Sequence, residues 1–275
     1  MRGRRNLVYQ HGELVAPKET LVTGASTVIV PTQEVADTFL SAGYKRDQIF
    51  VSGLCIESEL ARLAADSYQF RQARFHQRAG LTGLFFSSRA EPRQHIELLV
   101  SSIASCRRAG ISALVLVRKN GRLAREFLSS AQSQGITYSI VEPVSAGSDS
   151  TDRCQLGQYE DQAGEDTIVA RWFLRIDFIV GPPHERTNWA VGLGLPMFVL
   201  TPPIGPFAPM NLRLLESSGV GLAIRDAGSA AGLGPTILAL NQTGKLAEMA
   251  TRGWGKYQLD GFDRIARFLV QHNRH

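Results

Sequence analysis

The chain has 275 residues, of which 44% are hydrophobic and 20% are charged, and its formal net charge is +5. This length and balance exclude a disordered or fibrous protein and suit one large or two small globular cores. The modest positive charge is compatible with anionic ligands, although an excess of this size is equally typical of an ordinary solvated surface.

The first part of the chain alternates short apolar segments with helical patterns. In order, we predict a strand at 26–32, a helix at 33–44, a strand at 48–54 and a long helix at 57–80. The two strands are rich in β-branched and aromatic residues, and the helix between them repeats its apolar residues at helical spacing. This order predicts one strand–helix–strand unit followed by a linking helix.

A second alternating series begins after Gly80. We predict strands at 83–88, 112–118, 137–143, 176–182 and 196–203, and helices at 94–110, 123–135, 165–175, 186–194 and 211–219. Strands that alternate with helices of this length imply right-handed crossovers and a parallel sheet covered by helices on both faces. The predicted fold class is therefore α/β with a Rossmann-like sheet.

The interval from Ser145 to Gly164 breaks this series with a polar, Gly-rich stretch. Its acidic residues are Asp149, Asp152, Glu160 and Asp161. They lack the position-by-position oxygen pattern of a calcium loop, so we predict a surface loop and no metal site.

Cysteine spacing and hydropathy indicate the compartment. Cys55, Cys106 and Cys154 lack the short pair spacing of a zinc or redox motif and predict buried thiols in a reducing environment. No segment reaches the roughly 18 apolar residues that span a bilayer, and the basic start lacks the apolar core of a signal peptide. We expect a cytoplasmic protein and leave open a peripheral contact with the inner face of the membrane.

Ligands of open parallel sheets bind beyond the carboxyl ends of the strands. Ser87, Ser88 and Arg89 follow a predicted strand there and offer hydroxyl and guanidinium donors to a phosphate, with helix capping as the alternative role of the serines. Val141 and Pro143 end another strand, where backbone groups could contact a nucleotide base or simply terminate the strand.

The segment from His184 to Asn211 is the most promising ligand-facing stretch. It follows a buried strand, so the first-turn N–H groups of the next helix would face an anion above the sheet. Its candidate contacts are His184, Glu185, Thr187, Asn188, Trp189 and Asn211. Thr187 and Asn188 have helix capping as an equally weighted alternative.

Several of these marks resemble the carboxyl-terminal half of GT-B glycosyltransferases. Val30, Pro31 and Thr32 match the end of an early strand in that family, Gly194, Leu195 and Pro196 match its "GLP", and Gly205 and Asn211 match parts of the following turn. The most similar group is the family 28 type, which contains monogalactosyldiacylglycerol synthase and the N-acetylglucosaminyltransferase of peptidoglycan precursors. The resemblance covers most of the stretch from Ser26 to Leu222.

The resemblance implies a domain organisation and a ligand. Residues 1–62 would be a remnant of the amino-terminal, acceptor-side domain, 63–82 a linking helix, 83–260 the donor-binding Rossmann-like domain, and 261–275 a closing helix. The donor would be a nucleotide diphosphate sugar, with no other cofactor and no nucleic acid partner. His11 and Glu13 fall where the family faces its acceptor, and the imidazole of His11 suits proton transfer, although an exposed terminal histidine is the commoner case.

Two positions depart from the family pattern. Trp189 stands where the family has a glutamate that binds the ribose hydroxyls, and an indole offers one donor and no acceptor. Phe207 and Ala208 replace a polar Gln-Glu pair in the next turn. These changes favour either a different donor, with a base or sugar stacked on Trp189, or a domain that has lost donor binding.

Three functions remain open from the sequence. The first is a hexosyltransferase-type glycosyltransferase that displaces a nucleotide diphosphate from an activated sugar. The second is a non-catalytic nucleotide-binding subunit that needs a separate acceptor-domain protein. The third is a truncated, inactive product of a longer gene. We expect the enzyme, with a generic phosphate-binding α/β protein as the alternative fold-level interpretation.

Overall fold

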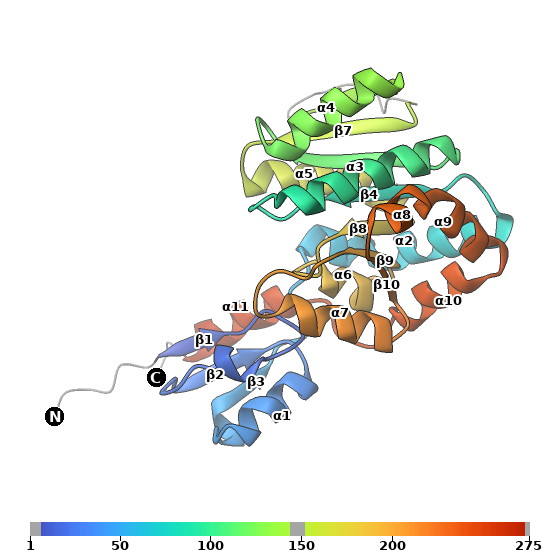
Figure 1. Cartoon of the computed structure of the whole chain (residues 1–275). Coiled ribbons are helices and arrows are strands. Elements are labelled where there is room, and N and C mark those ends of the chain that lie inside the picture. The colour runs from blue at the N-terminus through green and yellow to red at the C-terminus, as the bar shows by residue number, and fades with distance from the viewer. Residues whose placement is uncertain (1–6, 144–151, 273–275) are drawn as a thin grey trace.

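The computed structural model describes residues 7–143 and 152–272, and within them the chain forms two parallel β-sheets (Figure 1). The small sheet has the order β1-β2-β3, formed by β1 (Val8–Gln10), β2 (Thr27–Val30) and β3 (Ile49–Val51). The large sheet has the order β10-β9-β8-β4-β5-β7-β6. Its strands are β4 (Thr82–Phe86), β5 (Ser112–Arg118), β6 (Ser139–Val141), β7 (Cys154–Tyr159), β8 (Phe178–Gly181), β9 (Met197–Leu200) and β10 (Gly221–Ile224). Every neighbouring pair runs parallel, which confirms the predicted α/β class.

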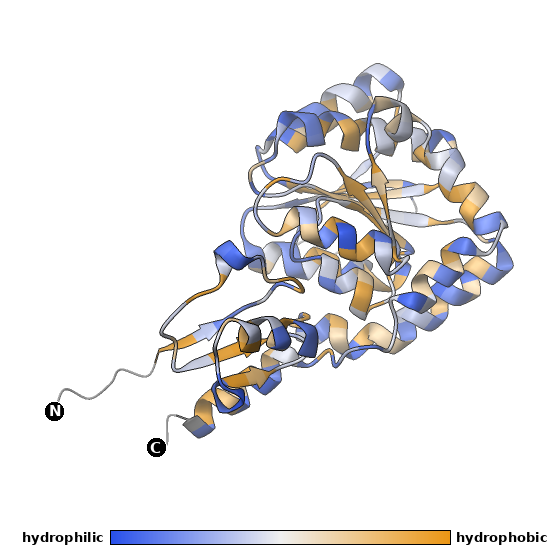
Figure 2. Ribbon diagram, turned by 60° about the horizontal axis from the view of Figure 1, so that its bottom comes forward, coloured by the Kyte–Doolittle hydropathy of each residue, from blue (hydrophilic) through white to orange (hydrophobic). Residues whose placement is uncertain are grey.

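Helices cover both faces of the large sheet (Figure 2). One face packs against α3 (Arg93–Arg108), α4 (Arg122–Gln134), α8 (Ala227–Ala231), α9 (Leu233–Gln242) and α10 (Lys245–Arg252). The other packs against α5 (Gln162–Trp172), α6 (Thr187–Gly192), α7 (Ala208–Ser217) and the first half of α2 (Ser58–Gln77). The fully buried strands β8 and β9 are almost purely apolar because neither of their faces meets water.

The small sheet has its own apolar core. Helix α1 (Gln33–Ser41) packs Val35 and Phe39 against Val28 and Val30. The last helix of the described chain, α11 (Gly261–His272), lies against this sheet (Figure 1). The Phe268 ring stacks on the Phe50 ring at a centroid distance of 4.3 Å. The two ends of the chain therefore meet in one unit.

Three strands, β1, β7 and β10, escaped the sequence analysis. β10 was missed because it has only four residues and begins with glycine, a residue that is depleted in strands. β7 lies inside the interval 145–164 that we predicted to be a surface loop, yet it pairs with both β5 and β6. That prediction was wrong because β7 reads Cys-Gln-Leu-Gly-Gln-Tyr, with no β-branched residue, and because Gln155 is buried despite its polarity. β1 was also missed, because only three residues form it.

The acidic residues of the same interval do not gather around a metal site in the described chain. Glu160 pairs with Lys119, and Asp161 caps the amino terminus of α5 by accepting from the Gly164 N–H. Asp149 lies outside the described residues. Over the ranges that the structure describes, no group of three or more His, Cys, Asp or Glu side chains is placed to hold a metal ion.

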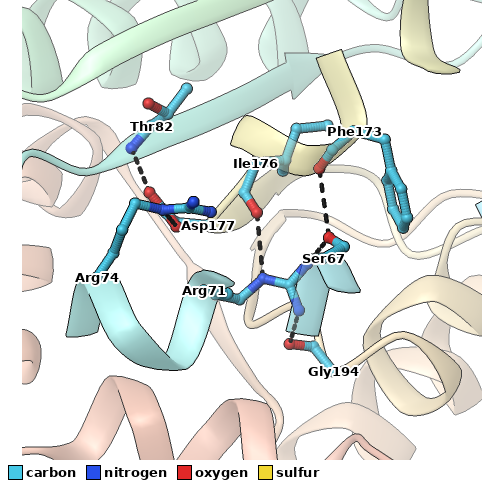
Figure 3. A network of polar contacts seen from close by, with 8 residues as sticks. All are labelled: Ser67, Arg71, Arg74, Thr82, Phe173, Ile176, Asp177 and Gly194. Carbon is cyan, nitrogen blue, oxygen red and sulfur yellow. Dashed lines mark hydrogen bonds and ion pairs between the residues drawn. The ribbon is translucent and has the colours of Figure 1, made fainter. Parts of the chain in front are cut away.

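A buried polar network joins α2 to the large sheet (Figure 3). The guanidinium of Arg71 is fully buried and donates to the carbonyl oxygens of Ile176, Leu193 and Gly194 at 3.1, 2.9 and 3.0 Å. These carbonyl groups belong to the turns that lead into β8 and β9. Arg71 thus holds the two turns that precede the central strands.

The neighbouring turn of α2 carries an ion pair. Arg74 Nε lies 2.6 Å from Asp177 Oδ1, and the other carboxylate oxygen of Asp177 accepts from the Thr82 N–H at 2.8 Å (Figure 3). The Asp177 side chain is completely buried, so both of its oxygens have partners as a buried carboxylate requires.

No helix in the described ranges is long and apolar enough to cross a membrane.

Candidate functional site

The loops that follow β4, β8 and β9 lie side by side at one edge of the large sheet. β8 pairs with β4 on one side and with β9 on the other, and all three strands end at this edge. The structure thereby brings Ser87, Ser88 and Arg89 next to the loop that holds His184 and Glu185. The order of the sheet, and not proximity in sequence, creates this juxtaposition.

Val141 and Pro143 are not part of this group. They follow β6, which is the edge strand and is separated from β4 by β5 and β7. Pro143 instead contacts α5, where its carbonyl oxygen accepts from Arg171 at 3.3 Å. A nucleotide base at Pro143 would therefore lie three strands away from a phosphate at Ser87.

The loop after β1 closes over the same edge from the small sheet. Asn211 donates from Nδ2 to Glu13 Oε2 at 2.9 Å and to the Pro183 carbonyl oxygen at 3.1 Å. Asn188 donates more weakly to the Gly12 carbonyl oxygen, at 3.5 Å. Two predicted site residues thus join the small sheet to the large one.

His11 is enclosed at this junction. Its ring is 3% exposed, packs edge-on against Phe39 and Phe207, and places Nε2 at 2.8 Å from the Val15 carbonyl oxygen. Because a carbonyl can only accept, Nε2 carries the proton here. Burial lowers the pKa of His11, so the ring is neutral at physiological pH.

Glu13, which the resemblance places with His11 on the acceptor side, lies at the same junction of the two sheets. Burial raises the pKa of its carboxyl group, the hydrogen bond from Asn211 opposes that shift, and the nearby Glu185 adds to it. A carboxyl group at the junction of the two sheets can take part in proton transfer. Only the fold brings Glu13 and Asn211 together, since 198 positions separate them.

Several polar atoms of this edge are buried without a hydrogen-bond partner in the described part of the chain. They are Ser87 Oγ, Thr187 Oγ1, Asn211 Oδ1 and His95 Nδ1. Buried polar atoms normally have a hydrogen-bond partner, so these four atoms make this edge a candidate for binding a polar ligand. Ser87, Thr187 and Asn211 are residues that the sequence predicts for the site, whereas His95 is new.

Trp189 lies beside this edge and is contacted by the charged side chains of Glu57 and Arg186. Its indole Nε1 donates to Glu57 Oε2 at 3.2 Å, and the Arg186 guanidinium lies 4.8 Å from its ring. Arg186 also covers the Phe86 ring at 4.3 Å and forms an ion pair with Glu165. With only 3% of its surface exposed, Trp189 offers no free face for stacking in this arrangement.

A small cavity adjoins Trp189. It has a volume of about 120 Å³ and lies between the start of α2, α5 and α6. Its polar lining residues are Glu57, Glu59, Asp166, Thr167 and Arg186, and Trp189 contributes part of the apolar wall. Burial raises the pKa of Glu57, while the Arg186 charge and the Trp189 hydrogen bond oppose that shift.

Burial of His95 makes the free energy of unfolding of the protein depend on pH. The ring is 1% exposed on the first turn of α3, and Nε2 lies 2.8 Å from the Pro202 carbonyl oxygen. Burial lowers its pKa below 6.5, so its contribution to stability is present above about pH 6.5 and is lost as the pH falls. We expect His95→Gln to flatten the decline in the free energy of unfolding between pH 7.5 and 5.5, by at most about 1.4 kcal/mol per pH unit.

Urea unfolding at several pH values checks this expectation. The matched control is His76→Gln, which changes an exposed histidine on α2 and should keep the wild-type slope. Equal slopes for both variants would contradict the role given to burial of His95.

Solved structures of nucleotide-sugar proteins share this architecture. The chain is similar to UDP-GlcNAc 2-epimerase of Neisseria meningitidis bound to UDP-GlcNAc, with a TM-score of 0.58 and 14% identity over 90% of this chain and 62% of that one. The chain is also similar to the MnaA protein of S. aureus in a structure with UDP, with a TM-score of 0.54 and 14% identity over 90% of this chain and 60% of that one. For HepE of Anabaena in complex with UDP and glucose, the TM-score is 0.50 and the identity is 17%, over 98% of this chain and 72% of that one.

These likenesses establish a GT-B-type α/β fold in which a Rossmann-like parallel sheet is flanked by helices. The chain spans about 60% of the length of the epimerase structures that it matches. No protein-family model and no curated protein matches the sequence.

Proposed function

We propose that the chain binds a nucleotide diphosphate sugar at the carboxyl edge of the large sheet, in a glycosyltransferase-type reaction. The observation that carries this proposal is the set of unpartnered polar atoms on Ser87, Thr187 and Asn211 at that edge. It is supported by the ligands in the similar structures, which are UDP, UDP and glucose, and UDP-GlcNAc.

The residues of the edge suit a diphosphate. Ser87 and Ser88 offer hydroxyl donors, and Arg89, which is exposed and bonded to Gln162 at 3.1 Å, offers a mobile cation. Hydrogen bonds from such groups stabilise the charge that develops on a departing nucleotide diphosphate. The unpartnered oxygens of Thr187 and Asn211 require a small opening of the edge before they reach the ligand.

Glu13 is our candidate for proton transfer. It projects from the small sheet into the junction, its pKa is raised by burial, and Asn211 orients its carboxylate. A carboxylate in such a position could remove the proton of an incoming hydroxyl group. His11 would then support the loop rather than act on the substrate, because its ring is enclosed by Phe39 and Phe207.

A separate polypeptide would supply the rest of the acceptor side. The small sheet has three strands, and residues 1–62 would be the acceptor-side remnant, 63–82 the link, 83–260 the donor-binding domain and 261–275 the closing helix.

Isothermal titration with UDP, UDP-glucose and UDP-GlcNAc tests the proposal. We expect UDP to bind, and we expect Thr187→Val to weaken binding about three- to tenfold, because the isosteric change removes one hydroxyl hydrogen bond. The control Thr236→Val, on an exposed position of α9, should bind as the wild type does. No binding at millimolar UDP would refute the proposed site, and binding without sugar transfer or hydrolysis would favour the subunit interpretation.

A further inference from the structure

Glu91 fastens the loop that carries Ser87, Ser88 and Arg89 to a neighbouring helix. The loop runs from the end of β4 to the start of α3, and its Glu91 N–H donates back to the Ser88 carbonyl oxygen at 3.1 Å. Glu91 has a φ angle of 43°, in the left-handed region. A residue with a Cβ atom keeps this conformation only where its surroundings hold it.

The carboxylate of Glu91 occupies the amino terminus of α4. Its Oε2 accepts from the backbone N–H groups of Arg122 and Leu123, and the Glu91 carbonyl oxygen accepts from Arg122 Nη1 at 3.2 Å. These contacts take the place of a capping side chain, since Gly121 at the N-cap has none. The helix dipole favours a negative group in this position.

Gly121 leaves the room that this carboxylate needs. A Cβ atom there would lie 2.7 Å from Glu91 Oε1 and 3.0 Å from the Arg118 carbonyl oxygen. The loop after β4 and the loop after β5 therefore pack so closely that an added Cβ atom at position 121 would clash with the Glu91 carboxylate. The amino terminus of α4 already holds an anion from the protein itself and is closed to a phosphate.

We propose that Glu91 is a positioning residue for the nucleotide-sugar site, a role that rests on the proposed function. By accepting hydrogen bonds from the first amides of α4, Glu91 fixes the backbone three residues downstream of Ser88. It thereby aims the Ser87–Arg89 donors at the shared edge of β4 and β8 and leaves that edge as the place for the diphosphate. Glu91 itself touches no ligand.

Titration of UDP into three variants separates this role from a general loss of stability. We expect Glu91→Ala to bind UDP at least about tenfold more weakly, because displaced donors no longer converge on the phosphates. Glu91→Gln keeps an acceptor oxygen for the α4 amides and should recover most of the affinity. The control Glu97→Gln removes an exposed carboxylate on α3 that pairs with Arg93, and should bind as the wild type does.

Hydrogen exchange of the amides at 88–91 provides a readout that does not depend on UDP. We expect faster exchange in Glu91→Ala than in Glu91→Gln or Glu97→Gln, at a thermal midpoint that all variants share within a few degrees. Unchanged UDP affinity in Glu91→Ala would overturn the positioning role alone. Equal weakening in the Ala and Gln variants would also overturn it, because charge and not the tether would then be responsible. Failure of the wild-type protein to bind UDP would overturn the proposed function and this role with it.

Discussion

Arg71→Met is expected to lower the free energy of unfolding by about 3–5 kcal/mol at pH 7.5. The substitution keeps most of the side-chain volume but removes every donor that meets the carbonyl oxygens of Ile176, Leu193 and Gly194. Each buried carbonyl left without a partner costs about 1–3 kcal/mol. Burial lowers the pKa of Arg71 only to about 9, so the wild-type guanidinium is charged at the pH of the measurement.

Urea unfolding followed by circular dichroism measures this loss. Arg71→Lys should lie between the wild type and the Met variant, because an ammonium group retains donors but lacks the planar fork that reaches two turns together. Arg62→Met is the matched control, since the Arg62 side chain on the same helix is 69% exposed and its change should cost little. A loss in Arg71→Met no larger than that in Arg62→Met would refute the importance of the network.

Gly194→Ala is expected to cost about 2–4 kcal/mol. Gly194 has a φ angle of 62°, which an L-residue adopts at a cost of roughly 1–2 kcal/mol. An added Cβ atom would also lie 2.7 Å from the Ala250 carbonyl oxygen, at the point where the Gly194 N–H donates to the Gly253 carbonyl oxygen. The backbone of α10 would have to move, and this movement adds to the conformational cost.

Gly244→Ala separates the two contributions. Gly244 has a φ angle of 75°, yet a Cβ atom there would meet nothing within 4 Å. It should therefore show only the cost of the left-handed conformation, and the difference between the variants should report the contact with α10. If both variants lose the same stability in urea, the close approach of α10 contributes nothing.

The "GLP" motif shows what the sequence could and could not reveal. The helix predicted to end at this motif and the strand predicted to begin there correspond to α6 and β9. Position 194 requires glycine because α10 packs against it, and its carbonyl oxygen accepts from Arg71. Both partners are distant in sequence. Likewise, the helical and apolar periodicities predicted β4, β5, β8 and β9, whereas β7 was missed because pairing on both sides overrides its polar composition.

For the candidate site, too, the sequence selected residues that follow predicted strands but did not reveal contacts between distant elements. Ser87 and Thr187 could be found because the carboxyl ends of predicted parallel strands lie at a common edge. His95 and Glu91 could not be selected, since each gains its role from a partner on another element. Glu13 was selected with His11 through the resemblance, but its contact with Asn211 could not be foreseen. The environment of Trp189 was also out of reach, because Glu57 and Arg186 approach it from different directions.

The return of α11 to the small sheet has a consequence for biosynthesis. Arg264 donates to the Val51 carbonyl oxygen across 213 positions, and Phe268 completes the packing on Phe50. A ribosome that adds about 5–20 residues per second would need at least about ten seconds to travel between these positions. The small sheet is therefore completed only after the whole of the large sheet has been synthesised.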